Sequence, residues 1–208
     1  MIEADRARAV ALFGDSVSRE TWDRLDRFVA LLLKWQKTTN LVAPSTLQNL
    51  WTRHVADSLQ LLDLAPAANR WIDLGSGAGF PGLVIACALG PTGEVHLVES
   101  NQKKASFLRE AARVLALPAI VHAGRIEDLV AEKPFDVVTA RALAPLDRLI
   151  GYAIPLLTTG AVGLFPKGQD VGAELTQASK SWSIEAELIP SKTDPHGRIV
   201  VVRHARKL

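Results

Sequence analysis

The stretch WIDLGSGAGFPG at residues 71–82 constrains the fold of this chain more than any other feature. An apolar run ends at Asp73, four glycines follow within nine positions, and the helix-forming run LVIACAL begins immediately afterwards. This order predicts a strand, a tight turn and a helix. Glycine has no Cβ and tolerates positive φ, so the turn lets a ligand approach the backbone near the free N–H groups of the helix. The pattern predicts the binding loop of a nucleotide-like cofactor; the alternative is a glycine-rich turn without a ligand.

Two classes of cofactor are compatible with this loop. Residues 77–82 match the G-x-G-x-x-G fingerprint of dinucleotide-binding folds, in which an acidic residue about 20 positions further on binds the ribose. Glu99 ends the second apolar run, EVHLVE, at about that distance from Gly77. The spacing alone is therefore compatible with NAD and an NAD-dependent oxidoreductase. Glu99 suits the ribose of either cofactor, so it does not discriminate, and a solvent-exposed acid at a strand end is the alternative.

Asp73 and Pro81 favour S-adenosylmethionine over a dinucleotide. Asp73 lies two residues before the first glycine, where its carboxylate would repel a pyrophosphate. S-adenosylmethionine carries an ammonium and a sulfonium group and no phosphate, so the same carboxylate attracts it. Pro81 removes one N–H group at the start of the helix, which weakens a site for a dianion. We therefore expect the methyl donor as the cofactor.

Composition predicts one globular unit with an appendage, without a strong global charge. The chain has 208 residues, 48% of them hydrophobic and 22% charged, with a formal net charge of +2. The longest apolar runs are too short to cross a bilayer, and no signal segment opens the chain, so we expect no membrane association. The single Cys87 has no partner for an internal disulfide, which fits a reducing, cytoplasmic setting.

The charge is distributed unevenly, because the last segment is basic. Residues 192–208 contain three arginines and two lysines against one acidic residue, Asp194. Such a patch attracts nucleic acid without a basic global average; a solvated charged terminus is the alternative.

The order of predicted elements indicates an α/β fold with an N-terminal helical cap over residues 1–66 and a core over residues 67–208. Apolar residues recur at helical spacing across 18–37, with Ser18 as the N-cap. From Trp71 onward strands alternate with helices, which predicts a mostly parallel sheet. We expect strands at 70–74, 94–99, 119–122, 135–140 and 161–166, and helices at 80–89, 101–116, 145–157 and 168–181. The runs SIEAELIP and GRIVVVRH have no room for a crossover helix between them and predict an antiparallel C-terminal hairpin. This is the Rossmann-like architecture of class I methyltransferases.

Ligands of such sheets bind beyond the carboxyl ends of the strands, and this rule nominates the polar residues that follow each strand. They are Asp73 to Gly79, Glu99 and Ser100, Gly124 to Asp128, Arg141 with Ala142, and Lys167 with Gly168. Ile126 and Glu127 lie where an adenine would be held; the alternative is that residues 127 and 128 only open a short helix.

The chain resembles the bacterial small-subunit rRNA guanine-N7 methyltransferases, the glucose-inhibited division protein B family, over nearly its whole length. The resemblance rests on KWQKTTNLV at 34–42, RHVADS at 53–58, DLGSGAGFPG at 73–82, ES at 99–100, RIEDL at 125–129, TARAL at 139–143, FPKG at 165–168 and GRIVVV at 197–202. It implies that Gly75, Phe80, Ile126, Glu127 and Arg141 contact the cofactor. It also implies methylation of N7 of a guanine in the 530 loop of 16S rRNA, guanine 527, on the small ribosomal subunit.

This reaction leads us to expect no catalytic acid or base. We also expect no metal, because the histidines show no metal-ligand spacing. Guanine N7 has a lone pair and no proton, so catalysis rests on holding N7 in line with the bond from sulfur to the methyl group. The expected cofactor residues are Asp73, Gly75, Ser76, Gly77, Gly79, Phe80, Glu99, Ser100, Ile126, Glu127 and Arg141. The expected RNA residues are Arg53, His54, Arg141, Lys167, Arg198 and Arg203. A monomer is expected, and a non-catalytic RNA-binding module is the second alternative to the enzyme.

Overall fold

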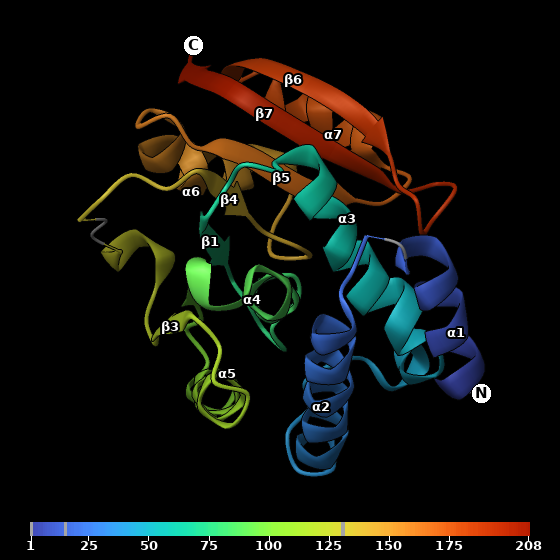
Figure 1. The fold of residues 1–208 in the computed structure, drawn as a ribbon. Helices are drawn as coiled ribbons and strands as arrows, with labels where there is room; N and C mark the ends of the chain where they lie inside the picture. Colours follow the sequence, from blue (N-terminus) through green and yellow to red (C-terminus); the bar gives the residue numbers. More distant parts are fainter. Residues whose placement is uncertain (1, 15, 130–131) are drawn as a thin grey trace.

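A computed structural model describes residues 2–14, 16–129 and 132–208, and its centre is a seven-stranded mixed sheet (Figure 1). The strand order is β3-β2-β1-β4-β5-β7-β6. The first five strands in the chain run parallel, and β7 lies antiparallel to both β5 and β6. The strands are β1 Arg70–Leu74, β2 Glu94–Val98, β3 Ala119–His122, β4 Val137–Thr139, β5 Val162–Lys167, β6 Trp182–Pro190 and β7 Arg198–Lys207. The predicted fold class and the antiparallel hairpin are confirmed.

Helices cover both faces of the sheet, as the alternation of elements predicts. The α-helices are α1 Ile2–Phe13, α2 Arg19–Gln36, α3 Asp57–Leu64, α4 Gly82–Leu89, α5 Gln102–Val114, α6 Leu146–Leu157 and α7 Val171–Ala178. Shorter turns of other helix types are η1 Pro44–Asn49, η2 Trp51–Ala56, η3 Gly90–Thr92 and η4 Ile126–Asp128. Ser18 caps α2 by accepting a hydrogen bond from the Thr21 backbone N–H, as expected. None of the helices in the described ranges is long and apolar enough to cross a membrane.

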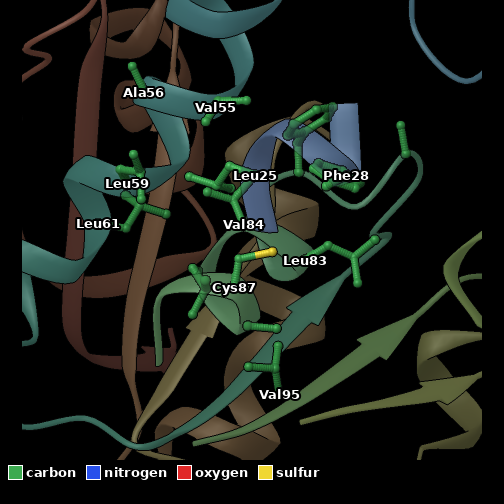
Figure 2. Close-up of a cluster of buried hydrophobic side chains, with 14 of the residues drawn as sticks. Leu25, Phe28, Val55, Ala56, Leu59, Leu61, Leu83, Val84, Cys87 and Val95 are labelled. Atoms are coloured by element: carbon green, nitrogen blue, oxygen red, sulfur yellow. The ribbon is translucent and has the colours of Figure 1, made fainter. Parts of the chain in front are cut away.

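The N-terminal helices share a hydrophobic core with α4, the helix that follows the glycine-rich turn. Leu83, Val84 and Cys87 of α4 are fully buried, and Leu25 of α2 and Leu59 of α3 pack in the same cluster (Figure 2). A helix with so little exposed surface must be covered on both sides. The first 66 residues therefore complete the core beside the glycine turn, and the boundary at residue 66 stays a prediction. Burial raises the pKa of the Cys87 thiol to about 12, so it packs as an apolar side chain.

Asp5 fixes the position of the segment that carries Arg53 and His54. Its fully buried carboxylate accepts hydrogen bonds from the backbone N–H groups of Trp51 and Thr52, at 2.7 and 3.2 Å, and from the Thr52 hydroxyl at 2.6 Å. Both backbone donors belong to the first two residues of η2. Asp5 therefore anchors the start of η2 from a distant helix.

Candidate functional site

The glycine-rich turn has the backbone conformation that the sequence predicts. Gly75, Gly77 and Gly79 have φ values of +69°, +54° and +89°, a region that other residues rarely adopt. A Cβ on Gly75 would lie 2.6 Å from Leu143 Cδ1, so the turn also needs glycine for space. Strand β1 ends at Leu74 and α4 begins at Gly82, so the turn joins the carboxyl end of a central strand to a helix N-terminus.

Asp73 lies next to this turn, and one of its carboxylate oxygens is buried without a hydrogen-bond partner among the described residues. Its side chain is buried, and Oδ2 accepts a hydrogen bond from the Gly82 backbone N–H at 3.1 Å. Oδ1 is also buried and has no hydrogen-bond partner among the described residues. Burial raises the pKa of Asp73 to about 7, although the Gly82 hydrogen bond opposes this rise. An unpaired buried acceptor of this kind is suited to a cationic ligand group.

Glu99 links the turn to the end of β2. Its Oε2 accepts from the Gly77 backbone N–H at 2.8 Å, and its Oε1 accepts from the Asn101 backbone N–H at 2.7 Å. Glu99 is therefore no free strand-end acid, because it holds the turn in place. Each oxygen keeps a second lone pair for a ligand hydroxyl. Ser76 is buried and donates to the Asp73 backbone carbonyl, whereas Ser100 is exposed.

The residues after β3 lie at the same edge of the sheet as Glu99. The Gly124 backbone N–H donates to the Glu99 carbonyl at 3.1 Å. Ile126 is half-buried and packs against the core, and Glu127 is exposed in the short turn η4. Both remain candidates for contact with an adenine.

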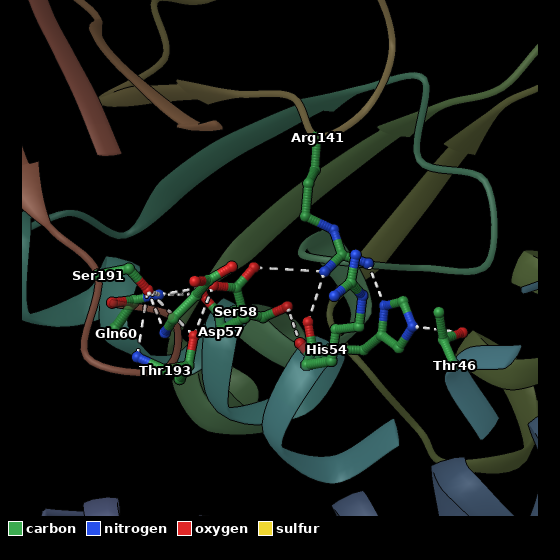
Figure 3. A network of polar contacts seen from close by, with 10 residues as sticks. Thr46, His54, Asp57, Ser58, Gln60, Arg141, Ser191 and Thr193 are labelled. Carbon is green, nitrogen blue, oxygen red and sulfur yellow. Dashed lines mark hydrogen bonds and ion pairs between the residues drawn. The ribbon is translucent and has the colours of Figure 1, made fainter. Parts of the chain in front are cut away.

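Arg141, after β4, reaches across to the N-terminal cap (Figure 3). Its Nη1 donates to the Arg53 carbonyl at 2.9 Å and to Asp57 Oδ2 at 3.3 Å, and its Nη2 contacts His54 Nδ1. The guanidinium carbon lies 5.5 Å from the centre of the Phe80 ring. Burial lowers the pKa of Arg141, and the Asp57 carboxylate opposes this effect. The Asp57 carboxylate is thus paired with Arg141, which lies 84 residues further along the chain.

His54 is neutral in this arrangement. Burial and the positive charges of Arg141 and Arg53 lower its pKa to about 3. Arginine only donates, so Nδ1 of His54 accepts and the proton lies on Nε2, which donates to Thr46 Oγ1 at 3.0 Å. The imidazole also stacks on Phe80, with ring centres 4.9 Å apart. Phe80 is buried between His54 and Phe28 in this conformation.

A cavity of about 1060 Å³ lies beside Arg141, between the cap and the ends of β4 and β5; we call it the cleft. Its walls come from residues 43–57 of the cap, 141–145 after β4, 166–174 around β5 and α7, and 191–199 at the β6–β7 turn. Arg141 belongs to this wall and, through Phe80, also contacts the glycine turn. The cleft and the turn are therefore adjacent.

The predicted RNA residues are divided between the cleft and other surfaces. Arg53, His54, Lys167 and Arg198 line the cleft, with Arg53 exposed. Lys167 is held within the protein, because Nζ donates to Glu174 at 2.7 Å and to the Ala144 carbonyl at 2.8 Å. Arg203 is not brought to the cleft. Lys167 of β5 pairs with Arg198 and Gly163 pairs with Val202, so Arg203 lies at the opposite end of these strands from the cleft.

Asp57 is the site residue that sequence reasoning missed. It joins Arg141 to the β6–β7 turn, since its Oδ1 accepts from Thr193 Oγ1 at 2.9 Å. The two partners lie 84 and 136 residues away along the chain, so no local pattern could reveal them. Outside the cleft, His96 contacts Glu94 and His122.

Comparison with known proteins gives a consistent result. A family model described as rRNA small subunit methyltransferase G matches residues 21–199. A protein of Bradyrhizobium sp. (strain BTAi1) named Ribosomal RNA small subunit methyltransferase G is 61% identical over 206 residues, which cover 97% of this chain and 92% of the relative. A protein of the same name from Methylobacterium radiotolerans is 54% identical, with 97% and 96% covered.

Solved structures with the same fold are more distant in sequence. The O-methyltransferase TomG from Streptomyces achromogenes, in complex with SAM, has a TM-score of 0.62 at 16% identity, with 97% of each chain covered. The O-methyltransferase from Bacillus cereus, in complex with SAH, has a TM-score of 0.61 at 18% identity, with 97% and 99% covered. At these identities the likeness concerns the fold.

Proposed function

The chain belongs to the rRNA small subunit methyltransferase G family, and we propose that it methylates N7 of a guanine in the 530 loop of 16S rRNA with S-adenosylmethionine as the methyl donor. The observation that carries the proposal is the buried, unpaired oxygen of Asp73 next to the glycine turn, which adjoins a cleft large enough for a nucleotide. Family membership disfavours the NAD-dependent oxidoreductase, because the matching family is one of methyltransferases.

The residues around the turn fit the proposed cofactor. When bound, S-adenosylmethionine supplies a methyl group activated by the positive charge on sulfur. Asp73 Oδ1 would accept a hydrogen bond from the cofactor's ammonium group, and the second lone pairs of the Glu99 oxygens would accept from its ribose hydroxyls. A Cβ at Gly77 would meet only the Gly75 carbonyl oxygen at 3.8 Å, so the backbone at this glycine leaves room for the cofactor. We assign Ser76, Phe80, Ser100, Ile126 and Glu127 to the same site.

Arg141 is suited to the cofactor's carboxylate. Three of its five N–H groups are used by Arg53, Asp57 and His54. Its charge acts on Asp73, so an ammonium beside Asp73 and a carboxylate beside Arg141 would form a complementary pair. The amino-acid end of the cofactor would therefore find a residue of opposite charge for its ammonium and another for its carboxylate.

The cleft receives the guanine and orients it. N7 needs no base to become nucleophilic, so the residues of the cleft contribute by holding the base and by excluding water. Arginine usually recognises guanine through O6 and N7, but N7 must stay free here, so the base is recognised on its other edge or by stacking. Arg53 and Arg198 line the cleft and are our candidates for phosphate contact, and the internally paired Lys167 supports the cleft wall.

We further propose that the protein is a cytoplasmic monomer that acts on the small ribosomal subunit. The basic residues at the cleft support an RNA partner. Gel filtration with light scattering measures the oligomeric state.

Methyl transfer provides the direct test. Purified protein and S-adenosylmethionine with a labelled methyl group are incubated with 30S particles or with bare 16S rRNA, both from cells that lack the endogenous enzyme. Label is expected at N7 of one guanine in the 530 loop, found by chemical mapping. RNA binding without transfer to either substrate would support the non-catalytic module. Binding of NADH but not of S-adenosylmethionine would support the oxidoreductase.

A further inference from the structure

Asp57 occupies the point at which three parts of the molecule meet. It begins α3 in the cap, and its Oδ2 accepts from Arg141 after β4. Its Oδ1 accepts from Thr193 Oγ1 at 2.9 Å and from Gln60 Nε2 at 2.8 Å (Figure 3). Both carboxylate oxygens are thus used, and the side chain is only 16% exposed. A carboxylate held from both ends has little freedom to reorient.

The β6–β7 turn holds Asp57 in place through Gln60 as well. Gln60 is buried, its Oε1 accepts from the Lys192 backbone N–H at 2.8 Å, and its Nε2 donates to Ser191 Oγ at 3.2 Å. A second connection between α3 and the same turn lies at the surface, where Lys192 Nζ pairs with Asp63 at 2.7 Å. Asp63 thus links the same two segments as Asp57 but makes no contact with Arg141.

Asp57 is the carboxylate that pairs directly with Arg141, whereas Asp73 acts on the guanidinium without contact. The guanidinium is mostly buried and its other two partners, the neutral His54 and the Arg53 carbonyl, carry no negative charge. A buried cation without a counter-charge is costly and moves toward other acceptors. Asp57 is the one carboxylate in contact with it among residues 2–14, 16–129 and 132–208.

We propose that Asp57 is a positioning residue, which fixes the guanidinium of Arg141 in the orientation that binds the cofactor and is itself held by Thr193 of the β6–β7 turn. This inference rests on the proposed function, because it assigns Arg141 to the cofactor. It predicts that Asp57 affects cofactor affinity without touching the cofactor.

The test compares Asp57→Asn with Asp63→Asn by isothermal titration with S-adenosylhomocysteine. Loss of one hydrogen bond to a charged group predicts that Asp57→Asn weakens binding about tenfold or more. Asp63→Asn removes a link between the same segments and is expected to change affinity less than about twofold, since exposed ion pairs contribute little. Thr193→Val keeps the Asp57–Arg141 pair, so it is expected to weaken binding by a smaller factor with an unchanged melting temperature. Equal effects of Asp57→Asn and Asp63→Asn would overturn the proposal.

A double-mutant cycle separates positioning from general structural support. If Asp57 acts through Arg141, Asp57→Asn causes no further loss of affinity in the Arg141→Gln background. Additive losses would show an independent role and overturn the proposal. Steady-state kinetics gives a second readout: Asp57→Asn is expected to raise KM for the cofactor more than it lowers kcat. Wild-type protein that fails to bind S-adenosylhomocysteine would refute the proposed function instead, so the two failures are distinct.

Discussion

Binding of S-adenosylmethionine is expected to release a proton from Asp73 and therefore to weaken as pH falls below 7. Burial raises the pKa of this carboxyl to about 7 in the free protein. A cofactor ammonium beside the unpaired Oδ1 would favour the ionised form of Asp73 over the protonated form, so the complex holds fewer protons than the free protein.

The sign of the effect on stability follows from the same pKa. Because the folded pKa lies above the ordinary 3.8, the free protein binds more protons than the unfolded chain between about pH 4 and pH 7. This carboxyl therefore lowers the free energy of unfolding as pH rises through that window, and a bound cation compensates for the loss.

The size of the effect on binding can be calculated. A group with a pKa of about 7 is half ionised at pH 7 and about one-eleventh ionised at pH 6, so the dissociation constant should rise about fivefold between these values. The ligand's own α-amino group, with a pKa of about 8, stays protonated in this range and does not obscure the change.

Isothermal titration at pH 6.5, in two buffers of different ionisation enthalpy, counts the protons released. About 0.8 proton per site is expected. S-adenosylhomocysteine, which keeps the ammonium but lacks the sulfonium, should release the same number. In Asp73→Asn the pH dependence should vanish, and binding at pH 8 should weaken about tenfold or more. The free variant should be at least as stable as wild type at pH 8, because no buried charge remains. A wild-type dissociation constant that is flat from pH 6 to pH 7, with no proton release, would refute this role for Asp73.

Three further changes test other parts of the structure. Gly82→Ala places a Cβ 2.2 Å from Leu97 Cδ2 and 2.8 Å from Asp73 Oδ2. Thermal melts should therefore show a loss of about 1–3 kcal/mol in the free energy of unfolding, together with weaker cofactor binding. The control is Gly172→Ala, which has open space around it and should be neutral or slightly stabilising. Asp5→Ala removes the acceptor of the Trp51 and Thr52 N–H groups and should lower the free energy of unfolding in urea by roughly 2–4 kcal/mol. The exposed Asp23→Ala should stay within about 0.5 kcal/mol of wild type. Equal losses would contradict the anchoring role of Asp5. In filter-binding titrations, Arg198→Ala should reduce the slope of log affinity for 16S rRNA against log salt concentration by about one. Arg203→Ala, which lies away from the cleft, should reduce this slope by less. A larger reduction for Arg203→Ala than for Arg198→Ala would indicate that the RNA binds elsewhere.

The fold and the glycine turn were predictable because their signals are local. An apolar strand, closely spaced glycines and an apolar helix lie within 20 residues, and the strand–helix alternation determines a parallel sheet. The short connection between the last two strands likewise predicts the hairpin. Asp73 was identifiable because its position before the turn is itself a local feature.

The contacts made across the chain were not predictable in the same way. Arg141 and Asp57 meet because the cap docks on α4, and the stacking of His54 on Phe80 depends on the same docking. A signal for docking did exist: in LVIACAL the residues from Leu83 to Cys87 are apolar on every side, so a second covering layer was required. Periodicity does not say which residues of that layer face the site.

The strand order has a consequence for folding. Strand β7 is an interior strand, paired with β5 on one side and β6 on the other, although it is formed by residues 198–207. Until this segment is in place, β5 and β6 each present an unpaired edge that can recruit another chain. The sheet therefore closes only when residues 198–207 insert between β5 and β6.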